Sequence, residues 1–428
     1  MTMFLLFGIL IALIAIGIPV AYVLGFVSII GLVFVSGFAN LPSLAHTYFE
    51  TLNSFILIAV PLYILMSNLL LEGKVSEKLF VAASRVLART PGGVGLATLV
   101  GCGAFAAMCG SSVATTSAIG TVAMPELEKR GYPKRFSAGL TATGGTLGIL
   151  IPPSIPLLLY GAITNVSIGD LFMAGVMPGI LTIFLFGLYV LYVGFTNRSI
   201  APETATSLRA QVSAVLISLP GILTIAIVLG GIYGGFFTPT EAAAVGVAWA
   251  LIVGLLVYRT LSPALIYKAL LNTAQTSAML LFIIIGAHAL GFVATMLRVP
   301  QELTAFIATI EVDVWVTLLM MSVLFLILGM FLDPISVISI TVPILFPVIL
   351  LYEINPIWFA ILMMKNMELA NITPPIGMNV FVVKGLDKRL TTRDAFIAVI
   401  PFAILDLIAL LLLFFFPQIS LWLPTLMR

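Results

Sequence analysis

Long apolar segments alternate with short charged loops along the whole chain. Most of these segments have about the 20 residues that an apolar helix needs to cross a bilayer. Gly17-Ile18-Pro19 interrupts the first apolar run, which is too long for one helix, so two spans are predicted there. Two mixed stretches, 40–51 and 261–272, are predicted to lie in the membrane interface. The predicted spans are 3–18, 19–36, 52–71, 137–165, 171–195, 211–233, 241–258, 273–296, 357–383 and 396–416.

Two further apolar segments, 94–127 and 314–349, are predicted to be re-entrant helical hairpins. The first lies between two loops rich in Lys and Arg, which the positive-inside rule places in the cytoplasm. It must therefore enter and leave the membrane on one side, with its tip at Gly110-Ser111-Ser112. The second hairpin follows a span that runs outward, so it is predicted to enter from the outside, with its tip near Gly329 to Pro334.

Two of the predicted spans carry residues that cannot continue a helix. Residues 144–156 hold three glycines and the pair Pro152-Pro153, and residues 366–379 hold Pro374-Pro375 and Gly377. Glycine is unfavourable inside a helix, and proline removes a hydrogen-bond donor and clashes with the preceding turn. Broken backbone at membrane depth is tolerated only where protein or a water-filled site satisfies its peptide groups. Both breaks are therefore predicted to be binding sites.

The two halves of the chain repeat the same order of features. Pro19 corresponds to Pro239, the two hairpin tips correspond, and so do the two Pro-Pro pairs. Because the hairpins enter from opposite sides, the halves are predicted to be inverted relative to each other, as in secondary transporters. The first repeat is assigned to 1–195, a cytoplasmic linker to 196–210, and the second repeat to 211–428.

Composition narrows the possible functions. The chain is 61% hydrophobic and 8% charged, whereas soluble domains are about 25% charged, so a multi-pass membrane protein is predicted. No basic run is long enough to indicate nucleic-acid binding. Cys102 and Cys109 lie in a Gly- and Ala-rich segment and are interpreted as packing residues. No phosphate-binding loop motif occurs, so ATP is not expected to drive the chain directly.

Carbonyl and hydroxyl oxygens at the breaks and tips suit Na⁺, while the positive ends of half-helices suit a carboxylate. The alternative is that the small residues only allow close helix packing. The first predicted Na⁺ site comprises Gly110, Ser111, Ser112, Gly145, Thr146 and Gly148. The second predicted cation site comprises Gly329, Asp333, Asn371, Thr373 and Gly377. The candidates for substrate contact are Ser112, Pro152, Arg298, Asp333 and Asn371.

Ionisable residues inside apolar segments are functional candidates by default. Asp333 could ligate a cation, relay a proton or pair with Arg298, and it could equally cap a helix that begins at Pro334. Lys365 is a possible partner for Glu368 beside the second break, and Asp406 is interpreted as a lone acid that faces protein.

Several motifs closely resemble the large membrane subunit of tripartite ATP-independent periplasmic (TRAP) transporters. The resemblance covers most of the chain and includes GSSVATTSAIG at 110–120, AGLTATGGTLGILIPPS at 138–154, LFMAGVMPG at 171–179 and GGIYGGFFTPTEAAA at 230–244. It implies a bacterial inner-membrane importer that couples Na⁺ to the uptake of organic acids such as sialic acid or C4-dicarboxylates. It also implies an elevator mechanism, a small four-helix membrane subunit and a periplasmic substrate-binding protein.

Two alternatives to this interpretation remain at this point. One is a stand-alone Na⁺/carboxylate symporter of related fold, which would need no binding protein. The other is an intramembrane enzyme, although the chain has no His-Glu-x-x-His motif and its buried acids lack the surroundings of a paired-aspartate protease. An enzyme is therefore not expected.

Overall fold

The structure is a computed structural model that describes residues 2–197, 200, 207–299, 301–302, 305 and 313–427. Its described residues form helices joined by short turns, and they include no strand. Nine helices in this part of the chain are long and apolar enough to cross a membrane, and Val20–Ser36 and Gly93–Cys109 are shorter apolar helices. The prediction of an all-α, multi-pass membrane fold is therefore confirmed.

The first half of the chain contains ten α-helices and two short 3₁₀ turns among its described residues. These elements are α1 (Thr2–Ala15), α2 (Val20–Ser36), η1 (Phe38–Asn40), α3 (Leu41–Leu52), η2 (Phe55–Ile58), α4 (Ala59–Glu72), α5 (Val75–Val86), α6 (Gly93–Cys109), α7 (Ser112–Lys129), α8 (Lys134–Leu150), α9 (Ile155–Thr164) and α10 (Ile168–Thr196).

The second half follows the same plan of long helices, a hairpin and a broken helix. Its described elements are α11 (Leu208–Tyr233), α12 (Pro239–Ile252), the π-helical turn η3 (Val253–Val257), α13 (Pro263–Met296), α15 (Val314–Phe331), α16 (Pro334–Leu351), α17 (Pro356–Ala370), α18 (Met378–Leu386), α19 (Thr392–Phe415) and α20 (Gln418–Leu426). Most of the predicted linker 196–210 lies outside the described residues.

Both hairpins and both breaks occur where the sequence predicts them. Helices α6 and α7 turn at Gly110, and α15 and α16 turn at Leu332 and Asp333. The first predicted broken span is α8 followed by α9, and the second is α17 followed by α18. The bonds Pro152-Pro153 and Pro374-Pro375 are both cis. The first 36 residues form two helices, with Gly17 at a φ of 93° between them.

Three elements differ from the sequence-based expectation. Helix α5 occupies part of an expected loop, because its apolar residues are buried against α6 and α11 while its charged residues stay outside. Stretch 261–272 is not a separate interfacial helix, since it continues into the following span as α13, with no proline or glycine to stop it. The short helix α20, which packs against α10, was not expected at all.

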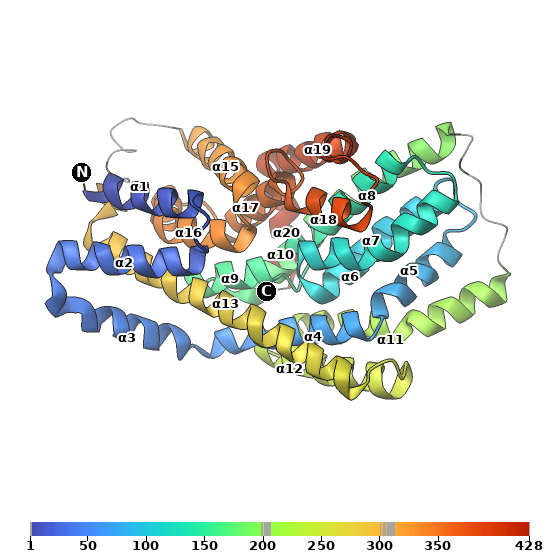
Figure 1. The fold of residues 1–428 in the computed structure, drawn as a ribbon, viewed down its shortest axis with the longest axis horizontal. Helices are drawn as coiled ribbons and strands as arrows, with labels where there is room; N and C mark the ends of the chain where they lie inside the picture. Colours follow the sequence, from blue (N-terminus) through green and yellow to red (C-terminus); the bar gives the residue numbers. More distant parts are fainter. Residues whose placement is uncertain are drawn as a thin grey trace.

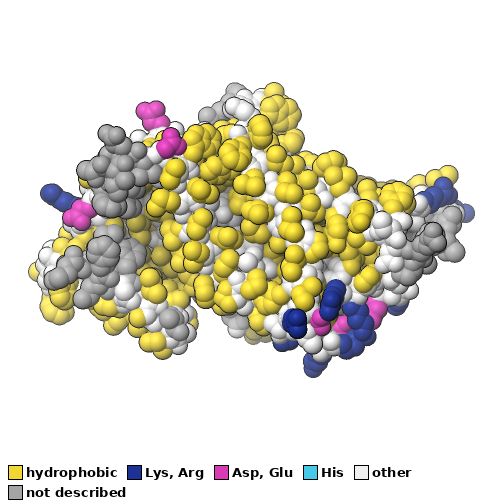
Figure 2. Space-filling view, turned by 90° about the horizontal axis from the view of Figure 1, so that it is seen from above, with side chains coloured by type: hydrophobic (Ala, Val, Ile, Leu, Met, Phe, Trp, Pro, Cys, Tyr) yellow, Lys and Arg dark blue, Asp and Glu magenta, His cyan; other side chains and the backbone are white. Residues whose placement is uncertain are grey.

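One part of each broken helix, α9 in the first half and α17 in the second, lies in the middle of the bundle. In Figure 1, α17, α9 and α10 occupy the centre, with α6 to α8 and α18 on one side and α1 to α3 on the other. Figure 2 shows a face that is mostly apolar, with charged side chains gathered towards its ends. Large apolar side chains are exposed on helices such as α11, α13 and α15, as expected where lipid is the solvent.

Candidate functional site

The first helix break is closed by side chains rather than left open. Helix α8 ends at Leu150, and α9 begins at Ile155. The Ser154 hydroxyl accepts a hydrogen bond from the Leu157 N–H at 3.3 Å and donates one to the Ile149 carbonyl. Ser154 thus caps α9 and is hydrogen-bonded to the last turn of α8. These two bonds fix the backbone where it changes direction.

The tip of the first hairpin lies directly against this break. Gly110 has a φ of 60°, and a Cβ on it would lie 2.3 Å from the Pro153 carbonyl oxygen. The Ile155 N–H donates to the Gly110 carbonyl at 3.3 Å. On α8, a Cβ on Gly148 would lie 2.6 Å from the Ser111 carbonyl oxygen. Only glycine allows these approaches, because the atoms that would be met belong to backbone.

The structure thus brings the residues of the first predicted cation site to one place. Ser111 caps α7, and the Ser112 hydroxyl is buried and points across the bundle to Asn379 at 2.8 Å. Thr146 donates to the Thr143 carbonyl at 2.7 Å, so the lone pairs of its buried hydroxyl oxygen are not used by that bond. A Cβ on Gly145 would clash with the Thr116 hydroxyl. Neutral oxygens of this kind suit a monovalent cation.

The second break is more open on one side. Helix α17 ends at Ala370 and α18 begins at Met378, after Gly377 with a φ of 59°. The intervening Pro374 and Pro375 are exposed, whereas Asn371 is only 1% exposed. Both polar atoms of the Asn371 amide lack a hydrogen-bond partner among the described residues. A buried amide in this state can complete the coordination of a bound ion or solute.

The second hairpin also reaches its break. A Cβ on Gly329 would lie 2.7 Å from the Ala370 Cβ and 3.1 Å from the Met367 sulfur. Gly329 is therefore beside the end of α17. Thr373, just beyond that end, donates its hydroxyl to the Leu369 carbonyl at 2.6 Å.

Asp333 caps α16, as one of its sequence interpretations proposed. Its carboxylate accepts from the Ile335 and Ser336 N–H groups at 3.1 and 3.2 Å and from the Ser336 hydroxyl. Arg298 is exposed two residues after the end of α13, and no ion pair joins these two described residues. The interpretation of Asp333 and Arg298 as partners is therefore not realised in the structure.

Asn379 links the two halves and was not among the predicted site residues. Besides accepting from Ser112, its side chain donates to the Ala142 carbonyl on α8 at 2.9 Å. Its backbone N–H donates to the Asn371 carbonyl at 3.2 Å. The first hairpin, the first broken helix and the second break therefore meet at one buried amide. The sequence signal for it is an amide residue two positions after Gly377 in an apolar stretch.

Comparison with known proteins identifies the family to which the chain belongs. The family model described as "Tripartite ATP-independent periplasmic transporter, DctM component" matches residues 7–419. The chain belongs to this family. It is thus a transporter permease and not an enzyme, as predicted from the sequence.

The relatives of this chain bear several substrate names. It is 38% identical over 385 residues to the C4-dicarboxylate TRAP transporter large permease protein DctM of Pseudomonas aeruginosa, with 89% of each chain covered. It is 31% identical over 414 residues to the sialic acid TRAP transporter large permease protein SiaM of Vibrio cholerae, covering 96% of this chain and 95% of the relative.

A solved structure shares the fold. The YdaH transporter of Alcanivorax borkumensis, whose structure is described as having an unusual topology, superposes with a TM-score of 0.62 at 15% sequence identity over 91% of each chain. At this identity the likeness concerns the fold alone.

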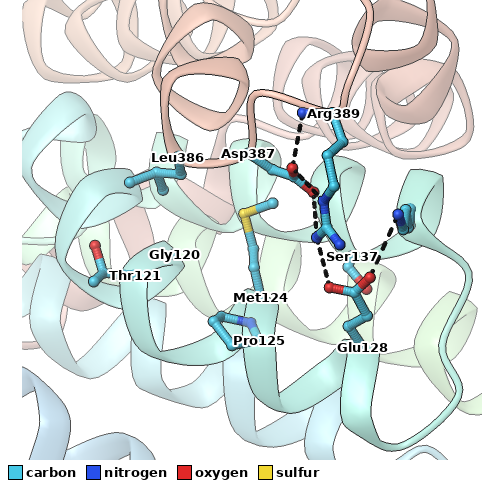
Figure 3. Close-up of a pocket in the computed structure, with 10 residues that line it drawn as sticks. Gly120, Thr121, Met124, Pro125, Glu128, Ser137, Leu386, Asp387 and Arg389 are labelled. Atoms are coloured by element: carbon cyan, nitrogen blue, oxygen red, sulfur yellow. Dashed lines mark hydrogen bonds and ion pairs between the residues drawn. The ribbon is translucent and has the colours of Figure 1, made fainter.

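A cluster of ion pairs joins the first hairpin to the turn after α18. Arg389 binds Glu128 on α7 at 2.7 Å and Asp387 at 2.8 Å, and Lys134 lies 3.5 Å from Glu128 (Figure 3). The hydrogen bonds from Arg389 hold the pKa values of the Glu128 and Asp387 carboxyls below their usual range. These groups line a cavity of about 170 Å³ between α7, α8 and the end of α18.

A second ionic cluster is fully buried. Lys365 on α17 binds Glu368 at 2.6 Å, so the predicted pairing of these two residues is confirmed. Lys365 also binds Asp406 on α19, which is therefore not a lone acid. The sequence offers a clue, since Lys365 and Asp406 are ionisable residues inside apolar helices, but it does not show that α17 and α19 place them together.

Proposed function

We propose that this chain is the large membrane subunit of a Na⁺-coupled importer of organic acids. It acts in the bacterial inner membrane together with a small four-helix membrane subunit and a periplasmic substrate-binding protein. The observation that supports this most is the meeting of a hairpin tip, the broken helix beside it and the second helix break through Ser112 and Asn379. Membership of a tripartite periplasmic transporter family supports the requirement for two partners.

Sodium is proposed as the coupling ion because of the kind of oxygen present. The first site offers backbone carbonyls and the hydroxyls of Ser111, Ser112 and Thr146 without any carboxylate. A set of neutral oxygens matches the low charge of Na⁺ better than that of a divalent ion. The second site, around Asn371 and Thr373, offers an amide and a hydroxyl of the same neutral kind.

An organic acid is proposed as the solute because half-helix N-termini gather at the breaks. Helices α7 and α9 begin at the first break and hairpin tip, and α16 and α18 begin at the second. Each such terminus carries partial positive charge, which favours a carboxylate. A C4-dicarboxylate is the preferred candidate, since the identity to the C4-dicarboxylate relative is 38% and that to the sialic acid relative 31%.

An elevator movement is proposed for the transport step. Hairpin tips packed onto broken helices form a tightly bonded unit that could carry its bound ion and solute as one body. The remaining long helices, among them α11 and α13, would stay in the bilayer as a scaffold.

Uptake into proteoliposomes tests the proposal. The complex of the large and small subunits is reconstituted, and labelled succinate or sialic acid is supplied with or without the cognate binding protein and a Na⁺ gradient. Uptake is expected only when both are present. Uptake without the binding protein would favour the stand-alone symporter, and uptake without Na⁺ would contradict sodium coupling.

Variants connect that assay to the site. Ser112→Ala is expected to raise the Na⁺ concentration needed for half-maximal uptake by about tenfold, because one charge-assisted contact is worth roughly 1.5–3 kcal/mol. Ser117→Ala is the matched control, since Ser117 lies on the same helix but is exposed. Identical Na⁺ activation curves for both variants would count against the site.

A further inference from the structure

The buried ionic cluster of Lys365, Glu368 and Asp406 has no role in the proposed transport site. Its members come from α17 and α19, and Thr182 on α10 completes it. All four residues are 0% exposed. Burying charge in this way is unfavourable unless every charge is paired, so the protonation state of the cluster matters.

The hydrogen bonds fix the state of Lys365. Its Nζ lies 2.8 Å from the Thr182 hydroxyl, 2.6 Å from a Glu368 oxygen and within hydrogen-bond distance of an Asp406 oxygen. The Thr182 hydroxyl already donates its hydrogen to the Pro178 carbonyl at 3.0 Å, so it can only accept from Lys365. Three acceptors around one nitrogen require three N–H donors, which only the charged ammonium has.

One ammonium group can neutralise only one of the two carboxyl groups if both are ionised. If both were ionised, the cluster would carry one net negative charge at a fully buried position. Among the described residues, each carboxyl also has an oxygen without a hydrogen-bond partner, Glu368 Oε1 and Asp406 Oδ2. An ionised carboxylate with an unsatisfied buried oxygen is among the costliest groups to bury.

No other charge compensates for the excess. Apart from the cluster itself, the described helices packed against α10, α17 and α19 carry charged side chains only in their first or last turns or at their caps: Lys134, Arg135, Asp170, Arg209, Asp313, Asp333, Lys384, Asp387, Arg393 and Asp394. The other titratable side chains of these helices are thiols and phenols, which are normally neutral at pH 7: Cys102, Cys109, Tyr160, Tyr189, Tyr192 and Tyr233.

We infer that Glu368 and Asp406 together bind one proton at neutral pH, so that the cluster consists of one ammonium, one carboxylate and one carboxylic acid. The proton comes from water when the bundle folds, and no electron is transferred. The cluster is then electrically neutral, and one of the two unpaired oxygens becomes an O–H. Sodium is a poorer occupant, because two unpaired oxygens are too few to replace its hydration shell.

This proton site does not depend on the identity of the transported solute. It lies one helical turn before Asn371, so it keeps the charge of α17 balanced close to the second break. The inference can therefore be tested on purified protein that transports nothing.

Infrared spectroscopy of the purified subunit complex in detergent counts protonated carboxyl groups. At pH 7, the carbonyl stretch of one buried carboxylic acid per chain is expected, with a small shift in heavy water. Glu368→Gln and Asp406→Asn should each abolish this band, because the remaining carboxylate and Lys365 already form a neutral pair. Glu353→Gln, which changes an exposed acid, should leave the band intact.

The same count of charges predicts that removing Lys365 increases the carboxylic-acid band. Lys365→Met should double the band, since both carboxyl groups must then be protonated to remain buried. If that variant fails to fold, the two amide variants still decide the matter. A second measurement, proton release on unfolding in weakly buffered detergent, should show one proton more for the wild type than for Glu368→Gln.

Three outcomes would overturn the inference. A wild-type spectrum without the band would mean that both carboxyl groups are ionised. A band that survives in both amide variants would place the proton elsewhere. A band that is present in K⁺ medium and disappears on adding Na⁺ would show that Na⁺, not a proton, is the resident cation.

Discussion

The two helix breaks share a backbone plan but differ in their charge. When Pro152 is aligned with Pro374, Lys365 and Glu368 of the second half fall on Thr143 and Thr146 of the first. The two threonines bond to backbone within their own helix, at 2.8 Å to Gly139 and 2.7 Å to Thr143. At the same positions the second half has a buried ionic cluster that joins three helices.

The surroundings of the breaks differ as well. Pro152 and Pro153 are buried beneath the first hairpin tip, whereas Pro374, Pro375 and Ile376 are exposed. Glycine and proline dictate where the backbone must break, and that requirement is common to both halves. The side chains around each break are free to diverge, so equivalent positions in the repeat can have different chemistry.

The largest difference in the loss of stability is expected between Lys365→Met in the second half and Thr143→Ala in the first. Removing Lys365 leaves two buried carboxyl groups without their cation, and breaking a buried ion pair in this way typically costs about 3–5 kcal/mol. Removing the Thr143 hydroxyl deletes one hydrogen bond, worth about 1 kcal/mol. Thermal unfolding of the purified complexes measures both. Equal losses of stability in the two variants would mean that the buried charges of the second half do not contribute more to stability than the neutral hydrogen bond of the first.

A smaller difference, in the rate of uptake, is expected between Gly148→Ala in the first half and Gly329→Ala in the second. The new methyl of the first variant would meet the Ser111 backbone at 2.6 Å, and backbone cannot move aside easily. At Gly329 the sulfur of a flexible Met367 is among the nearest atoms, although the Ala370 Cβ lies at 2.7 Å. Overpacking costs about 1–3 kcal/mol, so uptake should fall at least tenfold for Gly148→Ala and less for Gly329→Ala. The reverse order would refute the tighter first contact.

Asn379→Ala tests the connection between the halves. It removes a side chain that accepts from Ser112 and donates to the Ala142 carbonyl. Leaving buried groups unpaired costs about 1–3 kcal/mol, and the Na⁺ dependence of uptake should change with it. Asn366→Ala is the control, because Asn366 is also buried but its side-chain amide donates within its own helix, to the Leu362 carbonyl at 2.8 Å. An identical effect of both variants would leave Asn379 as an ordinary packing residue.

The smallest effect is expected for Arg389→Gln at the ion pairs after α18. Arg389 lowers the pKa values of Glu128 and Asp387, so its stabilising effect is present above the ordinary carboxyl range and is lost as the pH falls through those lowered values. Between pH 7 and pH 3, the wild type should therefore lose stability that Arg389→Gln already lacks. Lys388→Gln, an equal charge change at an exposed neighbour, should titrate like the wild type. Parallel curves for all three proteins would show that the ion pairs contribute nothing.

Sequence reasoning located the elements whose cause is local. Gly110, Pro152, Pro374 and Gly377 alter the backbone wherever they occur, so the tips and breaks could be placed from their positions. The same holds for the cap at Asp333, which needs only the proline that follows it.

The remaining features depend on which helices become neighbours. Asn379 and Ser112 are far apart in the chain, as are Thr182, Lys365 and Asp406, and no periodicity within one helix shows that they meet. Helix α5 was missed for a related reason, because its charged residues signalled a loop while its apolar face is buried by α6 and α11.

Binding of radioactive sodium to the purified complex tests the central claim that the paired breaks form an ion-coupled transport site. Saturable binding is expected for the wild type and for Ser117→Ala, and it should weaken at least tenfold in Ser112→Ala and in Asn371→Ala. The absence of saturable binding in the wild type, or unchanged binding in both site variants, would contradict the account.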